Sequence, residues 1–234
     1  MSCLPSSQEL FRDRVRKLLI RVDTTVLYKL TYGVYIIGVF KDGLPSGCVV
    51  NTCFQITSDK PLLAVSLNKK NYTLEAIRET KRFSLSILAE HTSPELIGKF
   101  GFFSSRDTDK YSDAGFEVIG YTPCVNGRFA GRLILEAEKF VEFETHVLVV
   151  ARLVDTVSGE GVPMTYAYYH DVIKGSAPAN APTFRIAGSE GQKTTAKKRL
   201  VCDICGYTAE FDADLPEDYA CPICGASISH FRPE

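Results

Sequence analysis

The sequence predicts a mainly β protein, an antiparallel barrel followed by a small metal-binding module. Short runs rich in branched and aromatic residues, bounded by Gly, Pro, Asp or Asn, recur through the first 175 residues with few helical patterns and no βαβ rhythm. Two C-x-x-C pairs lie near the end of the chain. Between these parts, small residues with scattered prolines and glycines are typical of a linker.

The barrel strands are expected at 32–40, 48–57, 62–68, 83–88, 131–143 and 146–157. Lys41-Asp42-Gly43 is typical of a hairpin turn, and residues 58–61 of a second turn. Helical patterns cover 9–17, 72–79 and 91–100. No Gly-x-Gly-x-x-Gly follows a strand, so we do not expect a Rossmann cofactor site.

Composition bounds the class of protein. The 234 residues are 45% hydrophobic and 24% charged, with a net charge of −1. There is no run of about 18 apolar residues and no apolar signal-peptide core, so we expect a soluble cytoplasmic protein without a membrane span. Near-neutral charge argues against nucleic acid as a partner. The expected domains are 1–21 (a partly helical segment), 22–175 (the barrel), 176–199 (the linker) and 200–234 (the metal module).

The metal module carries Cys202, Cys205, Cys221 and Cys224 as two C-x-x-C-G pairs separated by 15 residues. A two-residue gap lets one turn present both sulfurs to one ion, and the following glycine lets backbone N–H groups point at the sulfurs. Four thiolates in a tetrahedron suit zinc or iron. Two structural disulfides fit poorly with an intracellular chain. A module of this size needs its metal for much of its folding energy.

This module resembles rubredoxin, the single-iron electron carrier, in V-C-D-I-C-G-Y-T (201–208) and in L-P-E-D-Y-A-C-P-I-C-G-A (215–226). Tyr219 stands where that family usually has tryptophan, and the stretch between the two pairs is shorter than in free-standing rubredoxins. The resemblance implies one iron held by four cysteines. A structural zinc ribbon is the alternative.

A second candidate site lies in 47–73, where a buried-looking strand ends in S-L-N-K-K-N-Y-T immediately before a predicted helix. Free N–H groups and the dipole at a helix N-terminus favour a phosphate, and lysines, amides and a hydroxyl stand beside it here. The alternative is an ordinary helix cap at Asn71 or Thr73 with solvated lysines.

The same stretch resembles the FMN-binding core of the flavin reductase-like split-barrel family. G-K-F-G (98–101), S-S-R-D-T-D-K-Y (104–111) and E-T-H-V-L (144–148) resemble further motifs of that family, with a threonine in place of the aspartate before His146. The resemblance spans roughly 22–186. It implies a split β-barrel that binds FMN and usually dimerises, with the flavin near the subunit interface.

Carried onto this sequence, the resemblance implies three groups of residues. Those along the flavin ring are Asn51, Thr52 and Cys53; those at the phosphate are Asn68, Lys69, Asn71 and Thr73; those that close the pocket are Ser105 and Arg106. His146 would lie near the nicotinamide of the electron donor. A hydrogen-bonded structural histidine and a small buried cysteine are the ordinary alternatives for His146 and Cys53.

The two-module layout resembles the high-molecular-weight rubredoxins of anaerobes. The resemblance implies an enzyme that passes electrons from NADH or NADPH through FMN to the iron. It also implies a partner that accepts these electrons, a flavodiiron protein that reduces nitric oxide or oxygen. Two alternatives remain. One is a flavin reductase with a structural zinc ribbon, and the other is a non-enzymatic FMN-binding electron store or sensor.

Overall fold

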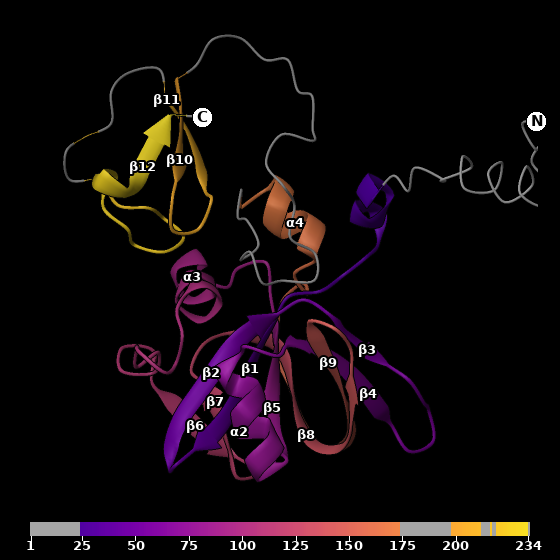
Figure 1. Ribbon diagram of the computed structural model, residues 1–234. Helices are drawn as coiled ribbons and strands as arrows, with labels where there is room; N and C mark the ends of the chain where they lie inside the picture. The colour runs from indigo at the N-terminus through magenta and orange to yellow at the C-terminus, as the bar shows by residue number, and fades with distance from the viewer. Residues whose placement is uncertain (1–23, 174–197, 212–215, 217–218, 234) are drawn as a thin grey trace, which may run out of the picture. The chain divides into compact units, whose positions relative to one another are not determined.

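The computed structural model describes residues 24–173, 198–211, 216 and 219–233 (Figure 1). The chain divides into two compact units, Met1–Leu30 and Thr31–Glu234. The described part of the first unit is a short 3₁₀ helix, η1 (Thr24–Lys29). The helix predicted at 9–17 and most of the predicted linker lie outside the described residues.

The second unit contains a seven-stranded sheet in the order β2-β1-β5-β8-β9-β4-β3, in which every neighbouring pair is antiparallel. The strands are β1 (Tyr35–Lys41), β2 (Leu44–Val50), β3 (Cys53–Gln55), β4 (Leu62–Asn68), β5 (Arg82–Leu88), β8 (Phe129–Glu142) and β9 (His146–Ser158). A separate hairpin joins β6 (Phe116–Ile119) to β7 (Thr122–Val125). The prediction of a mainly β fold is confirmed.

The strand predicted at 48–57 is wrong as a single element. β2 ends at Val50 and pairs with β1, whereas β3 begins at Cys53 and pairs with β4. These two strands form opposite edges of the sheet, yet only Asn51 and Thr52 separate them along the chain. Three virtual Cα–Cα bonds span at most about 11 Å. The sheet must therefore curl until its two edges approach, which produces the partly closed barrel.

The predicted turn at Lys41-Asp42-Gly43 is confirmed. Asp42 and Gly43 have φ values of 52° and 78°, and Lys41 pairs with Leu44 across the hairpin. Positive φ at both central residues is the geometry whose twist matches antiparallel strands.

Three α-helices accompany the barrel: α2 (Tyr72–Thr80), α3 (Pro94–Phe102) and α4 (Tyr166–Asp171). The prediction at 72–79 agrees with α2. The helix predicted at 91–100 begins later, because Ser93 caps it and Pro94 occupies its first turn. Helix α4 was not predicted, since six residues are too few to show a helical period.

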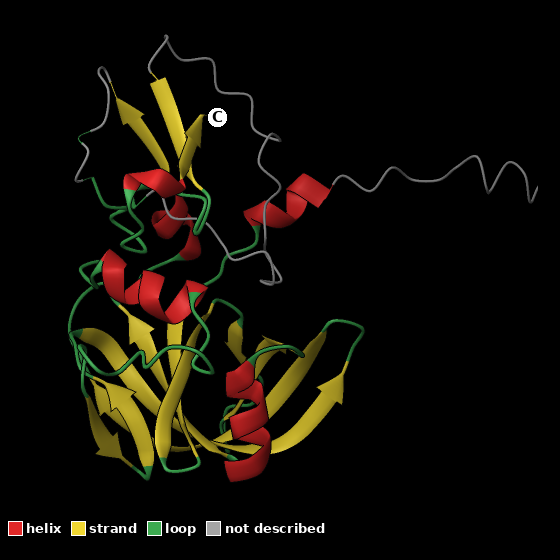
Figure 2. Ribbon diagram, turned by 60° about the vertical axis from the view of Figure 1, so that its left-hand side comes forward, coloured by secondary structure: helices red, strands yellow, loops and turns green. Residues whose placement is uncertain are grey.

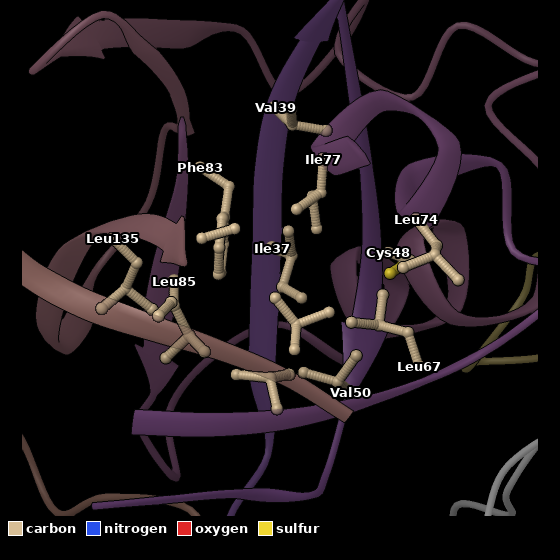
Figure 3. Close-up of a cluster of buried hydrophobic side chains, with 14 of the residues drawn as sticks. Ile37, Val39, Cys48, Val50, Leu67, Leu74, Ile77, Phe83, Leu85 and Leu135 are labelled. Atoms are coloured by element: carbon tan, nitrogen blue, oxygen red, sulfur yellow. The ribbon is translucent and has the colours of Figure 1, made fainter. Parts of the chain in front are cut away.

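The main core lies between the sheet and α2. Figure 3 shows Ile37 near Ile77 of the helix, with Phe83 and Leu85 of the neighbouring strand on the other side of Ile37. Leu74 of the helix belongs to the same buried cluster. This packing fixes the N-terminus of α2 against the barrel.

The C-terminal module has a three-stranded antiparallel sheet in the order β11-β10-β12 (Figure 2). Its elements are β10 (Lys198–Cys202), β11 (Thr208–Phe211), the 3₁₀ helix η2 (Ile228–His230) and β12 (Phe231–Pro233). β10 includes the last two residues of the predicted linker, whose backbone pairs with β11. None of the helices in the described ranges is long and apolar enough to span a membrane.

Replacing Leu85 with alanine should lower the free energy of unfolding by about 2–5 kcal/mol, because Leu85 is fully buried and the cavity left behind cannot fill. Chemical denaturation followed by circular dichroism measures this loss. Val118→Ala is the control, since Val118 is 58% exposed and should change stability by less than about 0.5 kcal/mol. Equal losses in both variants would contradict this description of the core.

Candidate functional site

A cavity of about 260 Å³ lies beside β2, β4 and the N-terminus of α2, with α3, the loop after it and α4 completing its wall. Five of the residues predicted to bind flavin line it: Asn51, Asn68, Asn71, Thr73 and Ser105. They come from three separate stretches of the chain, at positions 51, 68–73 and 105. The fold therefore brings together amides and hydroxyls that were singled out one by one from the sequence.

The N-terminus of α2 forms one end of the cavity. The Asn71 side chain accepts a hydrogen bond from the Thr73 backbone N–H at 2.9 Å and caps the helix. Asn68 similarly accepts from the Lys70 N–H at 2.9 Å. The capping alternative weighed from the sequence is thus present, and the same residues face the cavity. A cap and an anion site are compatible, because a helix start has four N–H groups without intrahelical partners.

The two adjacent lysines point differently. Lys70 lines the cavity, whereas the Lys69 ammonium lies 3.3 Å from Glu142, which also pairs with Arg78. Of these two side chains the sequence favoured Lys69 for a phosphate, and the structure places Lys70 at the cavity instead.

Arg106 and His146 lie outside the cavity lining. The Arg106 guanidinium pairs with Glu75 at 2.6 Å and stacks over the ring of Tyr72, itself a lining residue. His146 begins β9 opposite Asn68, and its Nδ1 lies 2.8 Å from the Thr145 hydroxyl. Its Nε2 is buried without a hydrogen-bond partner among the described residues. Arg106 and His146 thus each stand beside a lining residue, Tyr72 and Asn68 respectively.

Thr52 and Cys53 follow the lining residue Asn51. The Thr52 hydroxyl donates to the Asn51 side chain at 3.1 Å, and the Thr52 carbonyl accepts from the Ser66 N–H at 3.2 Å. Cys53 starts β3, and burial raises the pKa of its thiol to about 12. Cys53 is partly buried, and its thiol is neutral at ordinary pH.

Two lining residues were given no role by the sequence analysis. Cys48 and Lys110 are both buried, and burial lowers the pKa of the Lys110 ammonium to about 8. The Lys110 ammonium donates to the carbonyl oxygens of Gly47 at 2.8 Å and Phe100 at 3.1 Å. Phe100 lies in the last turn of α3, where carbonyls lack intrahelical partners and a cation is favourable. The sequence around Lys110 is rich in charged residues and does not predict that this side chain is buried.

The second candidate site gathers all four predicted metal ligands. The sulfurs of Cys202, Cys205, Cys221 and Cys224 lie within 4.8 Å of one another. Cys202 and Cys224 are 3.7 Å apart, and Cys205 and Cys221 are 3.4 Å apart. A tetrahedral ion with metal–sulfur bonds of about 2.3 Å requires sulfur–sulfur separations of about 3.8 Å. The spacing fits one ion better than two disulfides, whose sulfurs would be about 2.05 Å apart.

The two knuckles have the same backbone geometry. Gly206 and Gly225 both have φ of 71°, and their N–H groups donate to the carbonyls of Cys202 and Cys221 at 2.7 and 2.8 Å. A left-handed conformation of this kind favours glycine. The turns also direct backbone N–H groups at sulfur, from Tyr207 to Cys205 and from Ala226 to Cys224. Such donors stabilise thiolates, the form that binds a metal.

Comparison with known proteins identifies the family of the barrel. Residues 27–176 match the family described as flavin reductase like domain. The chain belongs to this family. It is 39% identical over 227 residues to the high molecular weight rubredoxin of Moorella thermoacetica, covering 90% of this chain and 99% of that relative. It is also 34% identical over 166 residues to the ferric-chelate reductase (NAD(P)H) of Archaeoglobus fulgidus, covering 70% of this chain and 98% of that relative.

A solved structure supports the fold of this flavin reductase-like chain. The styrene monooxygenase flavin reductase from Pseudomonas putida S12 superimposes with a TM-score of 0.53 at 23% identity, covering 62% of this chain and 91% of that one. Together the comparisons confirm the predicted split barrel with a rubredoxin-like tail and the prediction of an oxidoreductase.

Lys110 should make the stability of the protein depend on pH. Its pKa is about 8 in the folded state and ordinarily 10.5, so the unfolded chain binds more protons between these values. Stability due to this group therefore rises with pH across that window. Relative to Lys110→Met, the wild type should gain on the order of 2 kcal/mol between pH 8 and 10.

Denaturation of both proteins at several pH values measures this difference. Cys48 and Tyr111 also titrate nearby, and burial raises both of their pKa values, so the difference between the two proteins is the informative quantity. A difference that stays constant across the window would contradict the assignment of Lys110 as a buried ammonium.

Proposed function

We propose that the protein is an NAD(P)H-dependent oxidoreductase that passes electrons from FMN in the barrel to a rubredoxin-type iron in the C-terminal module. The observation that carries the proposal is the presence of two sites in one chain: a polar-ended cavity in a flavin reductase-like domain, and a four-cysteine cluster spaced for a single ion. Bound FMN would accept a hydride and release electrons singly, and a four-thiolate iron accepts one electron at a time.

The cavity residues fit a flavin nucleotide. Asn51, at the step between the two sheet edges, would lie along the ring, while Asn68, Asn71 and Thr73 would hold the phosphate at the start of α2. Ser105 would close the pocket from the loop after α3. A volume of about 260 Å³ is slightly below the range of about 300–1,000 Å³ usual for ligand sites. We further propose a homodimer, as the family resemblance implies, in which a second subunit helps to cover the flavin.

Thr52, Cys53, Lys69, Arg106 and His146 would contribute from just outside the lining. Arg106 would hold the loop after α3 through Glu75, since these two side chains form an ion pair. His146 has a buried Nε2 without a partner among the described residues, which suits a histidine that meets the nicotinamide or flavin when these bind.

Iron rather than zinc is proposed for the cysteines. The donor set suits both metals, but the relative that matches 90% of this chain carries rubredoxin in its name. Because both sites belong to one chain, the iron would be present at a raised effective concentration around the flavin. We further propose that the iron passes its electrons to a cytoplasmic flavodiiron protein that reduces nitric oxide or oxygen.

Replacing Cys205 with serine should abolish iron binding and reduce electron transfer to a protein acceptor to background, while NADH still bleaches the flavin at the wild-type rate. Cys205 supplies one of four ligands and is remote in sequence from every cavity residue. Anaerobic stopped-flow absorption, with metal analysis, separates the two steps.

Cys124→Ser is the matched control, because Cys124 is a buried free thiol outside both sites. It should keep its iron and its electron output. If Cys205→Ser reduced the protein acceptor as fast as wild type, the relay through the C-terminal module would be refuted.

A further inference from the structure

Lys110 is a buried cation without an anion. Its residue is 2% exposed, and the described part of the chain offers it two carbonyl oxygens but no carboxylate. Burying a charge is costly unless it is paired. The two carbonyls and the Phe100 ring, whose centroid lies 5.6 Å from the ammonium, offset only part of this cost. If Lys110 served only to hold the loop after α3 against β2, a neutral hydrogen-bond donor could do the same without the cost of burying a charge.

The ammonium also has a hydrogen-bond donor to spare. A lysine has three N–H donors, and two of them are directed at Gly47 and Phe100. Lys110 is itself one of the residues that line the cavity. A group in the cavity can therefore accept the third hydrogen bond.

The N-terminus of α2 meets the same corner of the cavity. Cys48 follows Gly47 in β2, and its thiol interacts with the side chains of Asn71 and Thr73 and with the charge of Lys110. Cys48 thus interacts with both the helix start and the buried ammonium. In Figure 3 the Cys48 sulfur lies beside Leu74 in the first turn of α2. Two sources of positive potential, a helix N-terminus and a full charge, thus line the same cavity and both interact with Cys48.

We propose that Lys110 is the buried counter-charge for the phosphate of the flavin nucleotide, acting opposite the N-terminus of α2. This rests on the proposed binding of FMN and adds a residue to which no flavin role was assigned. An anion that reaches this corner gains a charge-assisted hydrogen bond in a site shielded from water, where it is stronger than at the surface. Lys69 and Lys70, by contrast, are exposed.

The test compares FMN with riboflavin, which carries the same ring and no phosphate. Binding of each to the flavin-free full-length chain is titrated by fluorescence for wild type, Lys110→Met and Lys110→Gln. We expect FMN affinity to fall about tenfold or more in both variants and riboflavin affinity to stay within about twofold. The Gln side chain can still donate a hydrogen bond to the carbonyls of Gly47 and Phe100. Lys110→Gln should therefore fold even if Lys110→Met does not.

Lys99→Met is the matched control, since Lys99 pairs with Asp113 outside the cavity. It should change neither affinity. Equal losses for FMN and riboflavin in the Lys110 variants, or no loss for either, would overturn the assignment while leaving FMN binding by the wild type intact. A wild type that binds neither flavin would refute the proposed function itself.

Discussion

Gly47 in β2 is the point on which the cavity wall depends. The loop after α3 is fastened there by three side chains. Ser105 accepts from the Gly47 N–H and donates to its carbonyl, both at 3.1 Å, Lys110 donates to that carbonyl, and Tyr111 donates to the neighbouring Ser46 carbonyl. A Cβ at position 47 would stand 2.5 Å from the Ile37 carbonyl and 2.8 Å from the Tyr111 hydroxyl. Only glycine permits this close approach of loop and strand.

The second constraint is the two-residue step between β2 and β3. This short step forces the opposite edges of the sheet to approach each other. It also places Asn51 in the wall of the cavity, together with residues at the start of α2. The cavity is therefore a consequence of barrel closure. In the C-terminal module the equivalent constraint is the pair of left-handed glycines, Gly206 and Gly225, which turn two short loops toward one point.

Local patterns were sufficient to predict elements whose burial follows a simple period. β4 was predicted at 62–68 and lies at Leu62–Asn68, and the C-x-x-C-G spacing located all four clustered cysteines. The step at Asn51 and Thr52 gave no such signal, because both halves of 48–57 are equally rich in strand-forming residues. Hairpin β6–β7 is short and was missed for the same reason as α4.

The sequence does not predict which way the side chains in a turn point. Lys69 and Lys70 are adjacent, and which of them faces the cavity depends on the pairing of Lys69 with Glu142, far along the chain. The burial of Lys110 likewise depends on carbonyls at positions 47 and 100, which only the folded barrel brings together. The residue types in the sequence were enough to locate the functional region. Contacts between distant parts of the chain determine which of its side chains face the cavity.

We propose that flavin and iron occupy the two sites and exchange electrons. The most direct measurement is the absorption spectrum of anaerobically purified protein, with metal analysis, before and after NADH is added. We predict flavin bands overlaid on ferric–thiolate absorption, with stoichiometric iron and bleaching of both by NADH. Flavin bands alone with stoichiometric zinc would contradict the relay, and absence of any flavin would contradict the assignment of the cavity.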